Sequence, residues 1–168
     1  EAVIGWNDQT IAKFHEQTWT SLDGFIFAFY SRLYYQISIS NEFLRQTTDE
    51  KLNERGVDNA LKAEIATYRA EARFLRAFSY WHALDHFRNV PFVTEQDIVG
   101  SFSPRQANAQ ELFNYIESEL KAIDTELKPA LSNEYGRVDV VAAWMLLSKL
   151  YLNAEVYINT NRAQDALV

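Results

Sequence analysis

The sequence predicts an all-α fold of antiparallel helix pairs, and three observations predict it. Apolar residues recur at three- and four-residue spacing along most of the chain, which is the period of an α-helix. Only three prolines and five glycines interrupt the 168 residues. The hydrophobic content of 48% is ample for a packed core. We therefore expect four main helices and the beginning of a fifth.

The first helix is predicted from about Ser21 to Thr47. The hydroxyl of Ser21 can cap free backbone amides at the start of a helix. An apolar stripe follows at helical spacing: Phe25, Ile26, Phe29, Tyr30, Leu33, Ile37 and Leu44. The polar stretch 48–57, which contains Gly56, is predicted to be a connection.

The second helix is predicted to begin after the capping residue Asp58 and to end near Phe87. It carries two apolar stripes, and a helix that is apolar on two faces is packed between two neighbours. Its recurring alanines suit close approach of the neighbouring helices. Asn89, which tolerates the left-handed conformation, is expected to turn the chain. Pro91 prevents the helix from resuming, and residues 90–93 are predicted to be extended.

The third helix is predicted from Asn108 to about Leu127, with Glu111 completing a capping box. One face is apolar, and the other carries favourable pairs four residues apart. We expect its carboxylates to form a solvated face: Glu117, Glu119, Asp124 and Glu126. A fourth helix, apolar on nearly all sides, is predicted from Val138 to Tyr157, and a fifth near Arg162.

The second and fourth helices can be superposed with Leu75 on Leu146 and Tyr80 on Tyr151, an offset of 71 residues. This offset is about two units of the roughly 34-residue tetratricopeptide period. The alanine and aromatic positions of that repeat are kept only loosely. The pattern therefore predicts a degenerate tetratricopeptide-like stack with buried inner helices and more exposed outer ones.

Composition argues against several classes of function. Sixteen basic against 23 acidic residues give a formal charge of −7, which disfavours binding to nucleic acid. The absence of cysteine excludes thiolate metal sites and thiol catalysis within the chain. No apolar run reaches the roughly 18–20 residues that span a bilayer. The chain opens on Glu1 without a methionine and stops within a helical pattern, so we expect a piece of a longer protein.

Two groups on the second helix could carry chemistry, and both are interpreted as framework. His82 and His86 are spaced to share a metal ion, but no third ligand is evident, so no metal or other cofactor is predicted. Arg69, Arg73 and Arg76 could clamp an anionic ligand. We expect them instead to bridge carboxylates or carbonyls of neighbouring helices. No residue is indicated as a nucleophile or base, so an enzyme is not predicted.

The segment Glu1–Trp19 has a different character from the rest of the chain. Tryptophans alternate with amide and carboxylate side chains there, outside a clean helical pattern. Aromatic faces and hydrogen-bonding groups together are what a polar small-molecule site needs. Trp6, Asn7 and Asp8 are therefore candidate ligand-binding residues, and the alternative is that both Trp6 and Trp19 simply pack this segment onto the helices.

Several stretches resemble the SusD/RagB-like outer-membrane nutrient-binding proteins. The strongest is Arg69–Phe78, which continues through Tyr80 and Trp81 to the segment 89–92; the family usually has glycine where this chain has Asn89. Further similar stretches are Ala109–Phe113, Gly136–Val138 with Leu146–Leu152, and the opening Glu1–Ile4 with Trp6. The likeness runs in the expected order over nearly the whole chain.

The resemblance implies a non-catalytic glycan-binding lipoprotein at the bacterial outer membrane. Such proteins lie over a TonB-dependent transporter of the SusC type and deliver oligosaccharides or peptides to it. Residues 1–168 would be the N-terminal, tetratricopeptide-like part of the SusD-like fold. The lipidated cysteine would lie upstream and the C-terminal part of the fold downstream, both outside this chain. Trp6 and Asn7 would lie near a loop that contacts sugar.

Two other hypotheses remain open from the residues alone. One is a tetratricopeptide-like adaptor that binds a peptide or protein in a concave groove. The other is a helical enzyme or metal protein that uses His82 and His86.

Overall fold

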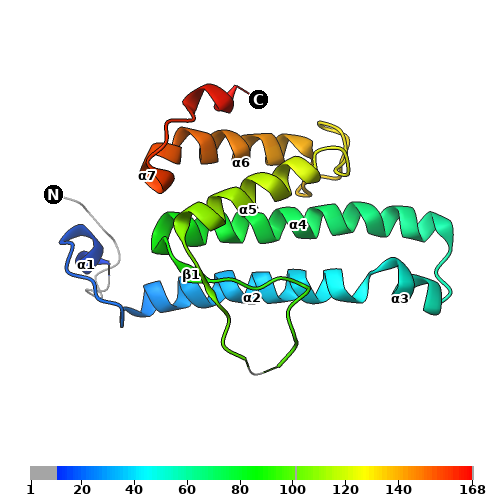
Figure 1. The fold of residues 1–168 in the computed structure, drawn as a ribbon, viewed down its shortest axis with the longest axis horizontal. Helices are drawn as coiled ribbons and strands as arrows, with labels where there is room; N and C mark the ends of the chain where they lie inside the picture. Colours follow the sequence, from blue (N-terminus) through cyan, green and yellow to red (C-terminus); the bar gives the residue numbers. More distant parts are fainter. Residues whose placement is uncertain (1–10, 101, 168) are drawn as a thin grey trace. The chain divides into compact units, whose positions relative to one another are not determined.

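The computed structural model describes residues 11–100 and 102–167 and confirms the all-α class (Figure 1). The chain forms two compact units, Glu1–Arg32 and Leu33–Val168, and the boundary between them falls inside a helix. In the described part of the chain, strands are limited to two residues each, and no helix is both long and apolar enough to cross a membrane. The elements, in order, are α1 (Ala12–His15), α2 (Gly24–Gln46), α3 (Asp49–Glu54), α4 (Asn59–Phe87), β1 (Val90–Pro91), β2 (Gln106–Ala107), α5 (Ala109–Ala122), α6 (Val140–Leu152), α7 (Ala154–Ile158) and the 3-10 helix η1 (Ala163–Ala166).

The first unit contains α1 and the start of α2. Asp23, rather than the predicted Ser21, caps α2, because its carboxylate accepts from the backbone N–H of Phe25 at 2.9 Å. The helix therefore begins two residues later than a cap at Ser21 implies. Serine and aspartate side chains can both cap a helix, so residue type alone does not distinguish Ser21 from Asp23.

In the second unit, α4 packs antiparallel to the part of α2 that follows Leu33. Arg69 Nη1 donates to the carbonyl oxygen of Leu44 at 2.7 Å, and Arg76 Nη1 donates to Asn41 Oδ1 at 2.7 Å. Residue numbers therefore rise along α4 as they fall along α2. This is the antiparallel pairing expected of a tetratricopeptide-like stack.

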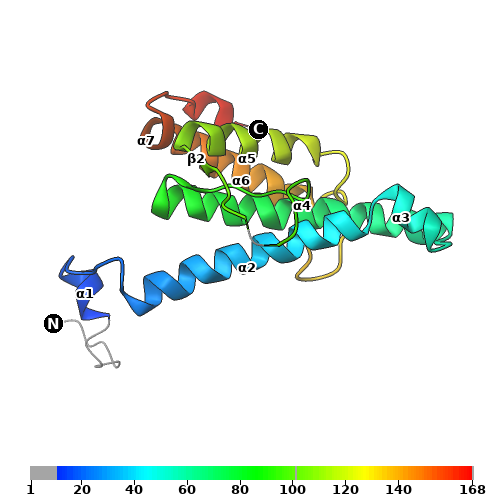
Figure 2. The same ribbon diagram turned by 60° about the horizontal axis from the view of Figure 1, so that its bottom comes forward.

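Helix α5 packs against both α4 and α6, again with antiparallel directions (Figures 1 and 2). The rings of Tyr80 and Tyr115 lie 5.5 Å apart on α4 and α5. The hydroxyl of Tyr151 on α6 donates to Glu117 on α5 at 2.8 Å. The predicted one-sided character of α5 is confirmed, because its apolar stripe is buried at Leu112, Phe113, Ile116 and Leu120.

The alanines of α4 permit these close approaches, as predicted. Ala70, Ala77 and Ala83 have no exposed surface, so neighbouring elements lie directly against the helix backbone at these points. Beyond α4, Val90 pairs with Ala107 in the short antiparallel ladder of β1 and β2. That ladder closes the loop 92–105, which is seen as the long green loop in Figure 1.

The turn after α4 differs from the prediction. Arg88, not Asn89, takes the positive φ, with φ of 64° and ψ of −59°. Asn89 instead accepts a hydrogen bond from the backbone N–H of Ala109 at 3.2 Å. Local preference pointed to asparagine, but the side chain of Asn89 is committed to a segment twenty residues away.

Three helix boundaries also differ from the prediction. The predicted connection 48–57 contains α3, because Thr48 caps it and Leu52 is buried there. Helix α5 ends at Ala122 rather than near Leu127, and Asp124 instead accepts from Trp144 Nε1 at 2.6 Å. The fourth helix is divided at Asn153 into α6 and α7. For α5 the contact at Asp124 comes from α6, whereas α3 is capped by its own neighbour Thr48.

Helix α6 is less buried than predicted. Its Met145 and Leu152 are 57% and 63% exposed, although Leu146, Leu147 and Leu150 are buried. A helix with apolar residues on all sides can be buried on all sides. The elements that pack against it determine which of those sides lose their contact with solvent. The predicted fifth helix is the 3-10 turn η1, where Ser148 Oγ donates to the carbonyl oxygen of Ala166 at 3.0 Å.

Candidate functional site

Three exposed aromatic side chains gather in the first unit: Phe14 of α1, Trp19 of the following loop and Phe25 of α2. The rings of Phe14 and Trp19 are stacked, with centroids 6.0 Å apart and planes inclined by 23°. Phe25 meets Phe14 edge-on, with centroids 6.4 Å apart. We call these three residues the aromatic cluster.

The aromatic cluster is open to solvent. Trp19 is 46% exposed and Phe25 is 47% exposed. The faces of aromatic rings carry partial negative charge, whereas the C–H groups on one face of a pyranose ring carry partial positive charge. An exposed stack of rings therefore suits a planar or sugar ligand.

The structure describes only part of the predicted binding segment. Trp6, Asn7 and Asp8 lie outside the described residues, so their role stays a prediction. Trp19, from the same predicted segment, is exposed and stacked as a site residue would be. Phe14 and Phe25 were not predicted as site residues. Phe25 belongs to the apolar stripe predicted for its helix, but the structure leaves it exposed.

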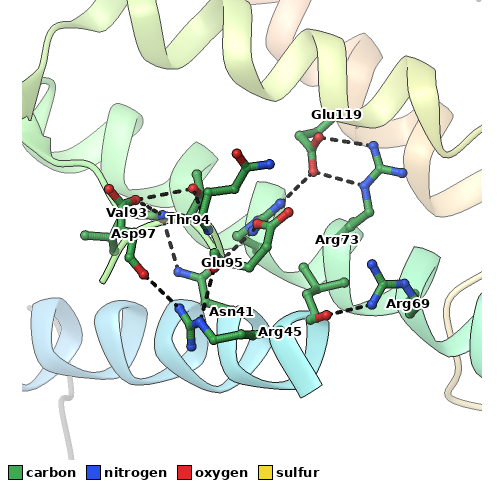
Figure 3. A network of polar contacts seen from close by, with 12 residues as sticks. Asn41, Arg45, Arg69, Arg73, Val93, Thr94, Glu95, Asp97 and Glu119 are labelled. Atoms are coloured by element: carbon green, nitrogen blue, oxygen red, sulfur yellow. Dashed lines mark hydrogen bonds and ion pairs between the residues drawn. The ribbon is translucent and has the colours of Figure 1, made fainter. Parts of the chain in front are cut away.

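The predicted arginine stripe is a buried polar network (Figure 3). Arg73 donates to the two carboxylate oxygens of Glu119 at 3.1 and 3.2 Å. Arg76 is almost fully buried and contacts Glu119 at 3.0 Å together with Glu95 and Asn41. The prediction that these arginines bridge carboxylates and carbonyls of neighbouring elements is confirmed.

The charge of Arg76 is secured by its surroundings. Burial alone would lower the pKa of this guanidinium. The hydroxyl of Tyr115 and the carboxylates of Glu95 and Glu119 outweigh burial and hold its pKa above the ordinary value. Arg76 is thus a permanent cation inside the fold, and its Nη1 and Nη2 groups donate to internal partners.

The network fixes the segment that follows β1. Asn41 Nδ2 donates to the carbonyl oxygen of Val93 at 3.2 Å, and Arg45 Nε donates to that of Glu95 at 3.1 Å. Tyr80 donates to the Val93 carbonyl and accepts from its N–H, both at 2.8 Å. The start of the loop 92–105 is therefore attached to α2 and α4 at several points, as Figure 3 shows for Asn41, Arg45 and Val93.

Two of the four carboxylates predicted to form a solvated face, Glu117 and Glu119, do not lie in solvent, whereas the side chain of Glu126 is 48% exposed. The side chains of Glu117 and Glu119 are only 16% exposed, and each is paired with arginine. Glu119 faces α4, and Glu117 receives Arg162 from the chain after α7. Their spacing on a helix gave no sign of this, because the partner arginines come from distant segments.

Glu117 is held strongly in its charged form. Partial burial alone would raise its pKa. Hydrogen bonds from Arg162, Lys121 and Tyr151 outweigh that effect and lower the pKa to about 2. The charged carboxylate therefore joins α5, α6 and the C-terminal segment.

This low pKa predicts an acid-dependent loss of stability. A carboxyl group whose pKa is depressed by folding stabilises the fold above its ordinary pKa and ceases to do so as the pH falls through the depressed value. We expect Glu117→Gln to lower the free energy of unfolding at pH 7 and to flatten its dependence between about pH 5 and pH 2. Urea unfolding of both proteins across this range measures the effect. Glu54→Gln, at an exposed position, serves as the control, and identical pH profiles for Glu117→Gln and the unaltered protein would contradict the prediction.

The two histidines lie among aromatic rings of the scaffold. Their ring centroids are 6.0 Å apart, and the ring of His82 also meets that of Phe78 at 4.5 Å. Burial lowers the pKa of His82, with a smaller contribution from His86. Among residues 11–100 and 102–167, no group of three or more His, Asp or Glu side chains is placed to hold a metal ion. The arrangement supports packing as the role of His82.

Comparisons with known proteins define the class of this chain. Residues 2–152 match the SusD-like family described as "Starch-binding associating with outer membrane". Because that match covers most of the chain, the protein belongs to the SusD-like family.

Particular relatives agree with this class. The chain is 34% identical over 158 residues to the starch-binding protein SusD of Bacteroides thetaiotaomicron, covering 94% of the chain and 26% of that protein. A solved laminarin-binding SusD-like protein is 27% identical with a TM-score of 0.65, over 83% of this chain and 28% of its own. Surface glycan-binding protein A of Bacteroides uniformis shares the fold, with 22% identity and a TM-score of 0.70 over 88% of this chain and 32% of its own. The chain thus spans about a quarter to a third of the length of these relatives.

Proposed function

We propose that this chain is the N-terminal helical part of a cell-surface protein that binds oligosaccharide or polysaccharide nutrients. The protein would be lipid-anchored at the outer membrane and would deliver its ligand to a partner TonB-dependent transporter of the SusC type. It would bind glycan without catalysing a reaction. The observation that carries the proposal is an exposed aromatic stack in a chain of the SusD-like family.

The aromatic cluster has the chemistry of a sugar-stacking surface. Two nearly parallel rings, Phe14 and Trp19, offer faces on which a pyranose ring can lie. Trp6, Asn7 and Asp8 would add a further ring together with amide and carboxylate groups for the sugar hydroxyls. Named relatives that bind starch and laminarin support glycans as the ligand class.

The scaffold supports the same proposal. Arg73 and Arg76 form ion pairs with Glu119 within the second unit. These side chains are therefore suited to stabilising the fold rather than to binding a ligand. Rigid helices that carry a binding surface on connecting segments are a common arrangement in binding proteins.

The proposal predicts that Trp19→Ala and Trp6→Ala each weaken glycan binding by about tenfold, which corresponds to roughly 1.4 kcal/mol. The loss is expected because each substitution removes a stacking face and leaves the helices intact. Isothermal titration calorimetry on the full-length protein, with maltoheptaose and laminarihexaose as ligands, measures the effect.

Trp144→Ala is the matched control, because Trp144 is 38% exposed on α6 and lies outside the first unit. Unchanged affinity in both Trp19→Ala and Trp6→Ala would refute the assignment of the site. If the unaltered protein binds neither glycan but binds peptides, the adaptor hypothesis replaces this one. Co-purification of a SusC-type transporter with the tagged protein from outer membranes tests the delivery step, and its consistent absence would remove that step.

A further inference from the structure

A hollow lies in the second unit, between the first half of α4 and the loop that precedes α6. Its volume is about 470 Å³, within the range of small-molecule pockets. Glu64, Thr67 and Tyr68 line it from α4, and Lys128, Glu134 and Arg137 line it from the loop. None of these residues was singled out as a ligand-binding residue from the sequence.

The loop side of the hollow is firmly held in place. Arg137 Nη2 donates to both carboxylate oxygens of Glu71 at 2.8 Å. Asn133 Nδ2 donates to the same carboxylate at 2.9 Å and to the carbonyl oxygen of Val138 at 2.6 Å. The backbone N–H of Leu131 donates to Asp139 at 2.9 Å. A wall fixed before the ligand arrives reduces the entropic cost of binding.

One wall is a guanidinium group placed over an aromatic ring. The guanidinium carbon of Arg137 lies 4.8 Å from the centre of the Tyr68 ring, and Glu71 holds that guanidinium in place. Tyr68 nevertheless remains 36% exposed. The hollow therefore offers apolar ring surface beside hydrogen-bonding groups.

Charges of both signs line the hollow. Lys128 and Arg137 are cationic, Glu64 and Glu134 are anionic, and Thr67, Tyr68 and Ser132 add hydroxyl groups. A strongly anionic or cationic ligand would meet lining groups of its own sign. A neutral molecule rich in hydroxyls can donate to the carboxylates and accept from the ammonium group, so it satisfies both kinds of lining group.

A neighbouring hollow of about 330 Å³, lined by Arg69, Arg73 and Glu126 among others, contains no aromatic residue. The hollow beside Tyr68 is therefore better suited to a sugar ring.

We propose that the hollow between Tyr68 and the loop 128–137 is a second carbohydrate-binding site, which takes a neutral saccharide unit. This inference rests on the proposed glycan-binding function and assigns an additional site to it. The site is separate in its residues from the aromatic cluster, so the two can be tested independently.

Hydrogen–deuterium exchange of the full-length protein with saturating maltoheptaose or laminarihexaose tests the inference. We expect backbone exchange in peptides covering 63–68 and 128–137 to slow at least about threefold with one of these ligands. Ala63→Trp should abolish that protection, because Ala63 is an exposed helical residue that lines the hollow and an indole would fill it. Ala122→Trp is the matched control, since Ala122 is also exposed and helical but does not line the hollow.

A second variant keeps the inference testable if Ala63→Trp fails to fold. Lys128→Met removes a donor at an exposed loop position, and we expect it to raise the ligand concentration needed for half-maximal protection about threefold. Trp19→Ala should leave protection at 63–68 and 128–137 unchanged.

The experiment distinguishes failure of the second site from failure of the proposed glycan-binding function. Protection confined to the first unit, or protection at 128–137 that persists in Ala63→Trp and Lys128→Met, would overturn the second site alone. Absence of binding to both saccharides would overturn the proposed function together with the second site.

Discussion

Replacing Arg76 by methionine is expected to lower the free energy of unfolding by about 3–5 kcal/mol, because the change breaks a buried charge network. Arg76 is only 2% exposed and contacts the carboxylates of Glu95 and Glu119. Methionine fills a similar volume but leaves Glu95 without its ion-pair partner and Glu119 with Arg73 alone. A buried carboxylate that loses its partner keeps the cost of its removal from water and loses the compensating attraction.

Chemical denaturation with guanidinium chloride measures this effect, and hydrogen exchange locates it. The segment 93–97 should exchange faster in Arg76→Met, because Glu95 belongs to this segment and the same network anchors it. Arg105→Met is the control, since the side chain of Arg105 is 59% exposed and its pair with Glu111 is solvated. Exposed pairs contribute about 0–1 kcal/mol, so the control should change little. A loss below about 1 kcal/mol for Arg76→Met would show that the network is not important for stability.

Phe113→Ala is expected to cost about 3–5 kcal/mol by opening a cavity in the core. Phe113 has no exposed surface on α5, and its ring lies against that of Tyr151 at 6.4 Å. The guanidinium of Arg162 also lies over this ring, 5.8 Å from its centre. Removing the ring therefore loosens contacts among α5, α6 and the C-terminal segment at once.

Thermal and chemical unfolding of Phe113→Ala, compared with Asn114→Ala, measure the cost. Asn114 is the next residue on the same helix but is exposed, so its replacement should change stability by no more than about 0.5 kcal/mol. Equal effects of the two substitutions would mean that α5 does not form the centre of the packing.

These two substitutions concern the scaffold, and glycan binding should respond to them only through stability. Below the unfolding transition, the affinity of the aromatic cluster for maltoheptaose in either variant should equal that in the unaltered protein. The aromatic cluster lies in a different compact unit from Arg76 and Phe113, so loosening the second unit need not disturb its rings.

Local signals in the sequence predicted the helices well where a cap and an apolar stripe coincide. Asp58 caps α4 by accepting from the N–H of Leu61 at 2.9 Å, as predicted. Asn108 and Glu111 form the predicted capping box at the start of α5. Both signals involve residues within three positions of each other, so the sequence alone contains all the groups that take part.

Features that depend on distant partners were predicted poorly. Glu117 and Glu119 were expected in solvent and are paired with arginines from other elements. Phe25 belongs to the apolar stripe predicted for its helix and is exposed beside Phe14. The hollow beside Tyr68 joins α4 to a loop some sixty residues away, and no pattern in the sequence places those two segments together.

The sequence by itself determined the all-α class, the main helices, the framework role of the arginines on α4 and the likeness to the SusD-like family. These follow from periodicity and from residue strings that can be recognised without coordinates. Only the tertiary structure decided where helices end, which carboxylates are paired, which aromatic rings remain exposed and where a hollow forms. The physical reason is that burial and pairing depend on which segments meet in space, and in this fold the decisive partners lie twenty to seventy residues apart.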